Sequence, residues 1–148
     1  MKIVLQRVTT AFVEINQVIC GEIGKGIVIL LGIEKGDSDK DVHFLAEKAA
    51  NLRIFEDSGG KMNRSIVDID GEALIVSQFT LAGDCRKGRR PSFENAAEPN
   101  LAEELYKNFI SLLQTKGIKT AEGKFGTTMK VSVLNDGPVT FILDSRRG

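Results

Sequence analysis

The run from Ile27 to Ile33 restricts the fold more than any other feature, because it carries no polar side chain on either face. A strand that is apolar on both faces belongs in the interior of a sheet. Shorter runs that alternate apolar and polar residues precede it at positions 3–5, 11–15 and 18–20, and Asn16-Gln17 offers a turn between the last two. The sequence therefore predicts a sheet whose central, buried strand is residues 27–33.

Two helices are expected in a chain that is otherwise rich in strands. Ser38 followed by Asp41 resembles a capping box, and apolar residues then recur at helical spacing as far as Leu52. A second helix is predicted to begin near Pro99, which suits the first helical position, and to end before Gly117, which suits the C′ position. The predicted buried face of this second helix is Leu101, Leu105, Phe109 and Leu112.

The remaining apolar runs complete an α+β pattern. Further strands are predicted at 53–56, 73–81, 129–134 and 139–144. Strands dominate and two helices are inserted between them, which indicates a mixed, mostly antiparallel β-sheet or barrel-like core with two helices. No stretch has the composition of a linker, so we expect one domain over residues 1–148.

Composition limits the partners and the compartment. Twenty basic residues balance twenty acidic ones, so a polyanion would have to be met by a local patch rather than by the overall charge. Cys20 and Cys85 are isolated and no signal peptide is visible, which is typical of reduced thiols in a cytoplasmic protein. The longest apolar run, 27–33, is too short to cross a bilayer, so no membrane association is expected.

The usual side-chain machinery of hydrolases is missing. His43 is the sole histidine, and it lies in the first predicted helix with no serine or cysteine motif nearby, whereas a catalytic triad needs a histidine beside its nucleophile. One histidine and two separated cysteines do not suggest a zinc site. No GxGxxG or GxxxxGK[ST] motif is present. We therefore expect neither a metal nor a cofactor.

A first motif, Ser77-Gln78-Phe79-Thr80-Leu81, lies at the end of the strand predicted at 73–81. Its polar residues interrupt an apolar run, and solvent-facing positions of an edge strand explain part of that pattern. The functional interpretation is that backbone N–H groups and hydroxyls at this corner face a reacting carbonyl.

A second motif, Asn135-Asp136-Gly137-Pro138-Val139-Thr140, lies between the last two predicted strands. Asp-Gly and Gly-Pro are strong turn signals, so the pattern alone predicts a β-turn. A glycine before proline also reaches backbone angles closed to other residues, and a cis bond there would present two carbonyl groups without any side chain.

Together and in this order, the two motifs resemble SQxTL and NxGPxT, the signatures of the D-aminoacyl-tRNA deacylase family, also called D-tyrosyl-tRNA deacylase. The resemblance covers the whole chain, including the opening Met1–Val8, the segment Lys87–Phe93 and the segment Gly123–Gly126. It implies a homodimer with its active sites at the subunit interface and no cofactor. The implied reaction is hydrolysis of D-aminoacyl-tRNA, and of glycyl-tRNA mischarged on alanine tRNA, to free amino acid and tRNA, with L-aminoacyl-tRNA rejected.

The resemblance also implies roles for particular residues. The implied catalytic corner is Ser77, Gln78, Phe79 and Thr80; Gly137 and Pro138 reach it from the other subunit and exclude L-amino acids; Phe125 and Met129 line the substrate pocket. Two mechanisms remain open for the family, with Thr80 as a nucleophile or with the 2′-hydroxyl of tRNA assisting water. This sequence favours the second, because Thr80 has no evident base. An aminoacyl ester is already activated, so orientation and oxyanion stabilisation can supply much of the rate.

A cluster of cations, Arg86, Lys87, Arg89 and Arg90, is either a solvated loop or a contact for the tRNA backbone. Two other functions remain open. A non-catalytic RNA-binding module would use the basic cluster but would leave the two motifs unexplained, and the chain has no tryptophan and one tyrosine for an aromatic platform. An esterase or amidase for small metabolites would not need the basic cluster.

Overall fold

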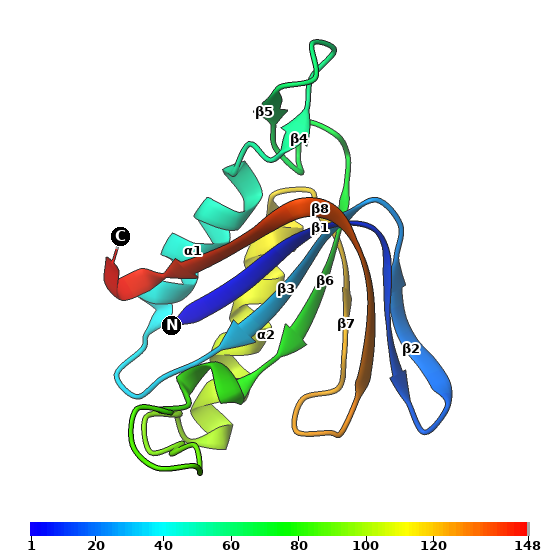
Figure 1. Cartoon of the computed structure of the whole chain (residues 1–148). Helices are drawn as coiled ribbons and strands as arrows, with labels where there is room; N and C mark the ends of the chain where they lie inside the picture. The colour runs from blue at the N-terminus through cyan, green and yellow to red at the C-terminus, as the bar shows by residue number, and fades with distance from the viewer. Residues whose placement is uncertain (148) are drawn as a thin grey trace.

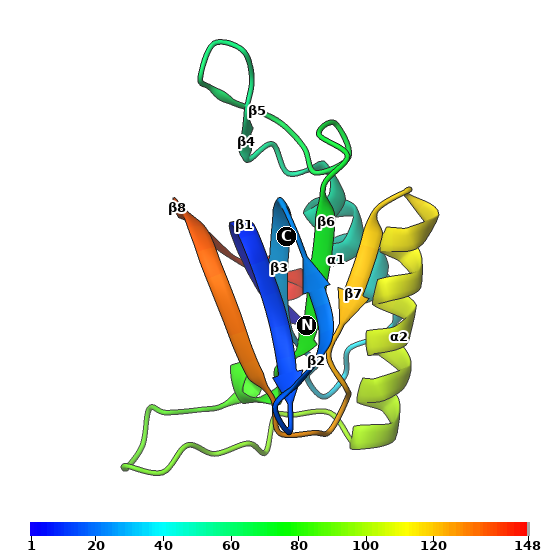
Figure 2. The same ribbon diagram turned by 90° about the vertical axis from the view of Figure 1, so that its right-hand side faces the viewer.

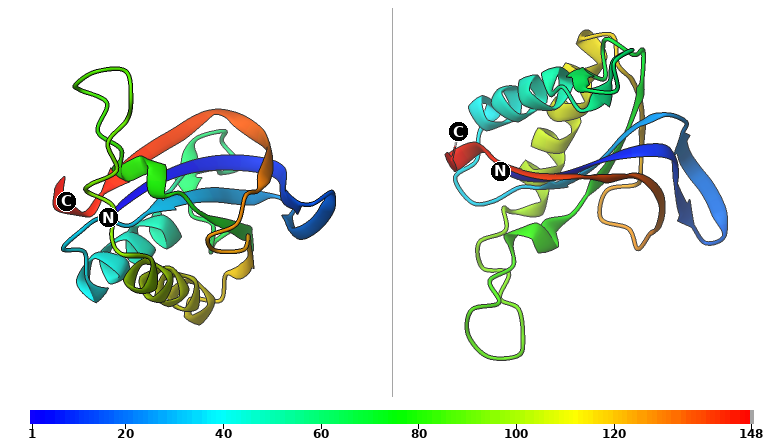
Figure 3. Two further views of the ribbon diagram at one scale, coloured as in Figure 1. Left: turned by 90° about the horizontal axis from the view of Figure 1, so that it is seen from below. Right: turned by 45° about the horizontal axis from the view of Figure 1, so that its top comes forward.

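Six strands form a mixed sheet that curls toward a barrel, and two helices pack side by side on one of its faces (Figures 1 and 3). The computed structural model describes residues 1–147. The sheet has the order β2-β1-β3-β6-β7, with β8 on the other edge of β1. The predicted α+β class, with a mixed and mostly antiparallel sheet, is confirmed.

The first strand, β1 (Lys2–Ile15), organises the sheet because it is long enough to serve three neighbours. Its first half pairs with β3 (Gly26–Gly32) and its second half with β2 (Val18–Ile23), both antiparallel. Along its other edge it pairs with β8 (Lys130–Asp144), also antiparallel. Nearly every residue of β3 is buried, as predicted for 27–33.

Two parallel strands complete the sheet. β6 (Glu72–Ser77) lies beside β3, and β7 (Lys119–Glu122) lies beside β6. β2 then curls back toward β7, and a Cβ placed at Gly21 would lie 2.6 Å from the carbonyl oxygen of Glu122. A glycine is required at this close approach, which brings the two ends of the sheet together into a nearly closed barrel.

The helices begin where the capping signals predict. α1 (Asp39–Asn51) starts after Ser38, whose N–H donates to the Asp41 carboxylate at 2.8 Å. α2 (Pro99–Thr115) has proline in its first turn and is followed by Gly117 at φ +81°. The buried residues of α2 are Leu105, Tyr106, Phe109, Ile110 and Leu113. Of the residues predicted on the buried face, Leu101 is exposed and Leu112 is half-buried against the main core cluster.

Two strand predictions need correction. The strand predicted at 73–81 ends at Ser77, and Phe79–Ala82 forms a short 3₁₀ helix, η1. The strands predicted at 129–134 and 139–144 are one strand, β8. Gln6 of β1 pairs with Thr140 and Val8 pairs with Asn135, so residues 136–139 bulge out opposite the single residue between them. The glycine and proline that suit a β-turn equally suit a bulge, and the chain does not reverse there.

A small hairpin projects beyond the sheet (Figure 1). It consists of β4 (Phe55–Glu56) and β5 (Met62–Arg64), which pair antiparallel around a turn at 57–60. The strand predicted at 53–56 thus exists in shorter form, and β5 was not predicted.

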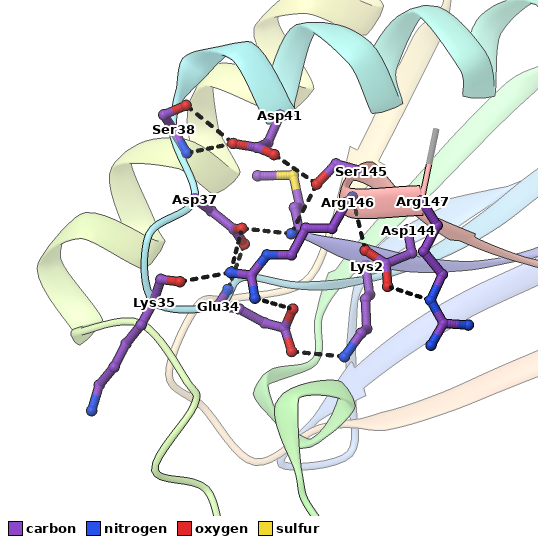
Figure 4. Close-up of polar contacts among 11 residues, drawn as sticks. Lys2, Glu34, Lys35, Asp37, Ser38, Asp41, Asp144, Ser145, Arg146 and Arg147 are labelled. Carbon is purple, nitrogen blue, oxygen red and sulfur yellow. Dashed lines mark hydrogen bonds and ion pairs between the residues drawn. The ribbon is translucent and has the colours of Figure 1, made fainter.

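Charged groups fasten the start of β1 to the end of β8 (Figure 4). The buried amino group of Met1 donates to Asp37 at 2.6 Å and to the hydroxyl of Ser145 at 3.0 Å. Arg146, in the short helix η2 (Ser145–Arg147), also reaches the carboxylate of Asp37 at 3.2 Å. Lys2 pairs with Glu34 at 2.7 Å. The buried carboxylates of Glu34 and Asp37 thus have cationic partners from the start of β1 and from the segment after β8, which ties the two ends together.

The main core cluster draws buried side chains from the whole length of the chain, from Met1 to Val139. This continuity supports the proposal of one domain over residues 1–148, of which Gly148 lies outside the described residues. Within residues 1–147, neither helix has the length and apolar character that crossing a membrane would require.

Candidate active site at the end of β6

A largely apolar cavity of about 370 Å³ opens where β3 and β6 end. Its wall comes from the ends of these strands, from η1, from the start of α2 and from the loop that follows β7. The lining residues are Leu31, Ile33, Ser77, Gln78, Phe79, Ala96, Ala97, Pro99, Ala102, Phe125 and Gly126. A cavity of this size and character suits a small ligand or one end of a larger one.

The corner between β6 and η1 carries backbone donors at the edge of this cavity, which Ser77, Gln78 and Phe79 line and Thr80 does not. The N–H of Gln78 is already used, because it donates to the carbonyl of Leu31 at 2.8 Å and continues the pairing of β6 with β3. The N–H of Leu81 closes the first turn of η1 on the carbonyl of Gln78 at 3.1 Å. Among residues 1–147, no acceptor is bonded to the N–H groups of Phe79 and Thr80. These two adjacent N–H groups can donate hydrogen bonds to an oxygen atom of a bound ligand.

Thr80 has no base beside it. Its hydroxyl accepts a hydrogen bond from the side-chain amide of Gln78, and within the described chain no carboxylate, lysine or histidine bonds to it. His43 is exposed on α1 and takes no part in the cavity. A hydroxyl needs a base to become a nucleophile, so this geometry does not activate Thr80.

Of the two predicted pocket residues, the structure brings Phe125 to the cavity and leaves Met129 outside it. Phe125 packs against Tyr106 of α2, with ring centroids 5.7 Å apart. Met129 is half-buried against the second core cluster, which contains Val13.

Tyr106 was not singled out from the sequence, although it supports the cavity wall. Its buried hydroxyl donates to the carbonyl of Ile75 at 2.9 Å, and the N–H of Gly123 donates to the same carbonyl at 3.3 Å. Burial raises the pKa of Tyr106, so the hydroxyl stays protonated and remains a donor. The carbonyl of Ile75, two residues before Ser77, therefore links strand β6 to helix α2 and to the loop that carries Phe125.

The bulge of β8 presents Gly137 and Pro138 to solvent, and the peptide bond between them is cis. Arg7 anchors the first residue of the bulge, Asp136. Its side chain is buried and donates to the carbonyl of Asp136 at 3.0 Å and to the carbonyl of Ile54 at 2.7 Å. Arg7 also forms an ion pair with the carboxylate of Asp136 at 3.0 Å. Sequence reasoning missed this role, because an arginine in an amphipathic strand gives no local sign of its partners.

The two motifs do not meet within one chain. Ser77 pairs with Leu31, and Leu31 pairs with Ile3, whereas the bulge lies opposite Arg7. Four residues of strand separate Ile3 from Arg7, which is about 13 Å along the sheet, and β3 and β1 lie between β6 and β8, which adds about 14 Å across it. A site that uses both motifs needs a second copy of the chain.

The predicted basic cluster lies on a long exposed loop that extends away from the body near η1 (Figure 2). Asp84 and Ser92 bond to each other through their backbones, at 2.8 and 2.9 Å, and close its base. The guanidinium of Arg86 is held by Asp84 through bonds of 2.6 to 3.1 Å, and this contact lowers the pKa of Asp84 to about 2. Within residues 1–147, Lys87, Arg89 and Arg90 form no ion pair.

No group of three or more histidine, cysteine, aspartate or glutamate residues within 1–147 is arranged to hold a metal ion. The cavity has an apolar wall, the backbone N–H of Phe79, the hydroxyl of Ser77 and the side-chain amide of Gln78, with the N–H and hydroxyl of Thr80 adjacent to it.

Comparison with known proteins gives consistent matches along the chain. The family profile for D-Tyr-tRNA(Tyr) deacylase matches residues 4–144. A D-aminoacyl-tRNA deacylase of Geobacter sulfurreducens is 56% identical over 99% of this chain and 96% of its own length. The protein of the same name from Thermodesulfovibrio yellowstonii is 58% identical over 96% of this chain and 97% of its own.

Two solved structures share the fold. The c-Myc DNA Unwinding Element Binding Protein has a TM-score of 0.91 at 41% identity, covering 97% of this chain and 98% of that one. A probable eukaryotic D-amino acid tRNA deacylase has a TM-score of 0.79 at 17% identity, covering 96% and 97%, which is a likeness of fold. The matches define the class as hydrolases of the aminoacyl-tRNA ester bond. The chain belongs to the D-Tyr-tRNA(Tyr) deacylase family.

Proposed function

We propose that the cavity at the end of β6 binds the aminoacylated 3′ end of tRNA and hydrolyses D-aminoacyl and glycyl esters while rejecting L-aminoacyl esters. The observation that carries the proposal is the pair of unbonded N–H groups at Phe79, which lines the apolar cavity, and at the adjacent Thr80. In ester hydrolysis, negative charge develops on the carbonyl oxygen, and two preorganised donors stabilise it.

The reaction needs no histidine. Water adds to the ester carbon, the bond from that carbon to the ribose oxygen breaks, and the proton passes to the leaving hydroxyl of the terminal adenosine. The ester is already activated, so orientation in the cavity and the two backbone donors supply the main rate gain. The neighbouring 2′-hydroxyl of the substrate can orient the water, which gives Thr80 a positioning role.

A comparison of two substrates tests the function. The purified chain should release D-tyrosine from D-tyrosyl-tRNA at a far higher kcat/KM than from the methyl ester of D-tyrosine. Tight tRNA binding without hydrolysis would instead indicate an RNA-binding module. Equal hydrolysis of the two substrates would indicate an esterase for small metabolites.

Replacing Thr80 tests the mechanism. Thr80→Ala keeps the backbone N–H and removes the hydroxyl, so we expect activity to stay within about tenfold of the parent, the size of one hydrogen bond. Single-turnover measurements with quenching would check this. A burst of acyl-enzyme trapped as an ester on Thr80 in the parent would reverse the assignment and make Thr80 the nucleophile.

A homodimer is proposed because β8 is an open edge. It is a 15-residue strand with one neighbour, β1, and most of its residues are exposed. Its exposed apolar side chains are Val133, Leu134, Phe141 and Ile142. A long apolar edge strand left open is a site of association, and a two-fold axis there would use the same surface on both copies. Two copies joined in this region can bring the bulge of one near the cavity of the other.

The basic loop is proposed to bind tRNA phosphates through Lys87, Arg89 and Arg90, with Arg86 contributing less because Asp84 holds it. The double variant Lys87→Ala/Arg89→Ala should lower the slope of log K against log salt by about 0.7 to 0.9 for each phosphate that the loop no longer neutralises. Fluorescence anisotropy with labelled tRNA at several salt concentrations measures this slope.

The matched control is Asp84→Ala/Arg86→Ala, which removes a neutral pair from the same loop. It should leave the salt dependence close to that of the parent. If neither double variant changes the slope, the loop does not bind tRNA phosphates and is only a solvent-exposed segment.

A further inference from the structure

We propose that the aromatic pair Phe79–Phe93 is a stacking site for the base of the nucleotide that precedes the terminal adenosine. The two ring centroids lie 5.1 Å apart at an interplanar angle of 65°, an edge-to-face contact. The two residues, Phe79 and Phe93, are 60% and 39% exposed, so their contact forms an exposed aromatic patch. Edge-to-face packing leaves at least one face of each ring uncovered by the other.

The backbone holds the pair in place. Phe93 follows Ser92, which closes the base of the loop on Asp84. Its carbonyl accepts the N–H of Ala96 at 3.0 Å, so the chain turns at Phe93 toward the cavity wall. A Cβ placed at Gly83 would lie 3.0 Å from the Phe93 ring, so the glycine leaves room for this ring to lie against η1.

The pair stands between two other features of the same surface. Phe79 also lines the cavity, and Phe93 belongs to the loop that carries Lys87, Arg89 and Arg90. The two rings therefore lie between the cavity, which Phe79 lines, and the base of the basic loop, which Phe93 follows. Single-stranded nucleic acid is bound in this way, with bases stacked on aromatic rings and phosphates near cations. With the terminal adenosine and its ester in the cavity, the next base reaches the rings and the following phosphates reach the basic loop.

The inference rests on the proposed function. Substrates of increasing length distinguish failure of the stacking site from failure of the deacylase activity. The substrates are the D-tyrosyl esters of adenosine and of a cytidine–adenosine dinucleotide. For the parent, we expect kcat/KM to rise about tenfold or more from the first to the second, mainly through KM, which is the order of one stacked base. In Phe93→Leu, which keeps an apolar side chain but removes the ring, this gain should disappear.

Phe93→Tyr restores a ring face and should restore the gain. Sedimentation of each variant reports whether the subunits stay together. The inference is overturned if the parent shows no gain with the dinucleotide, if Phe93→Leu lowers kcat/KM equally for both substrates, or if it dissociates the subunits, which would make the pair a subunit contact. Failure of the proposed function is distinct, because the parent would then hydrolyse neither ester.

Discussion

An Ile142→Lys variant should sediment as a single 16.2 kDa chain and lose at least about a hundredfold in deacylase activity, equivalent to roughly 2.7 kcal/mol of transition-state stabilisation. Ile142 lies on β8, and its side chain is 76% exposed in the isolated chain. If β8 forms the subunit contact, the substitution buries an ammonium group on each copy at the two-fold axis, and its desolvation is not compensated. Activity should fall because each cavity would lose the wall that the Gly137–Pro138 bulge of the other copy is proposed to add, and with it part of the orientation of the ester.

The matched control is Val18→Lys, which places the same charge on another exposed strand residue. Val18 is 65% exposed and lies far from Ile142, because Val18 pairs with Ile15 near the end of β1, whereas Ile142 pairs with Val4 near its start. It should remain a dimer of nearly parental activity. Circular dichroism of both variants checks that each chain folds. A folded, fully active monomer from Ile142→Lys would contradict the proposal that the active site spans two chains.

Pro138→Ala should lower the preference for D- over L-aminoacyl-tRNA at least about tenfold, roughly 1.4 kcal/mol, mainly by allowing L-substrates to react. The Cα of the ester carries an ammonium group, a hydrogen and a side chain. When the ammonium is held, exchanging D for L swaps only the hydrogen and the side chain. The exposed backbone of Gly137 and Pro138 is proposed to occupy the place of the L side chain. Proline fixes φ, so alanine leaves this obstacle less rigid.

Glycyl-tRNA provides an internal reference for this test. Glycine has no side chain to exclude, so its hydrolysis should change less than that of L-alanyl-tRNA when Pro138 is replaced. Pro91→Ala, in the basic loop, is the matched control, and it should leave the D-to-L ratio unchanged even if tRNA binding weakens. A D-to-L ratio that is unaffected by Pro138→Ala would remove the bulge from the selection mechanism.

Features of the fold that depend on neighbouring residues could be predicted. Ile27–Ile33 became the buried strand β3 because an apolar run on both faces needs cover on both faces. α1 began after Ser38 because its cap is formed by residues three apart in sequence. Gly117 ended α2 for the same local reason.

Features that depend on distant partners could not be predicted. β7 is four residues long and only partly buried, and β5 is three residues long and exposed; each is a strand because β6 or β4 lies beside it. The Gly137–Pro138 segment reads locally as a turn, yet the long partner β1 keeps the chain extended on both sides of it.

The candidate site divides in the same way. Its motif residues were visible in the sequence, and the structure brings Ser77, Gln78, Phe79 and Phe125 to one cavity. The supporting residues Arg7 and Tyr106 were not visible, because their hydrogen-bond acceptors lie 31 or more residues away in the sequence. The hydrogen bond from the N–H of Gln78 to the carbonyl of Leu31 could not be predicted either, because it depends on the parallel register of β3 and β6.

The most direct test of the central claim is the rate at which the purified chain deacylates D-tyrosyl-tRNA and L-tyrosyl-tRNA prepared on the same tRNA. We expect rapid release of D-tyrosine and a kcat/KM for L-tyrosyl-tRNA lower by at least about a thousandfold, equivalent to roughly 4 kcal/mol. Hydrolysis of the L-ester at a comparable rate would contradict the account.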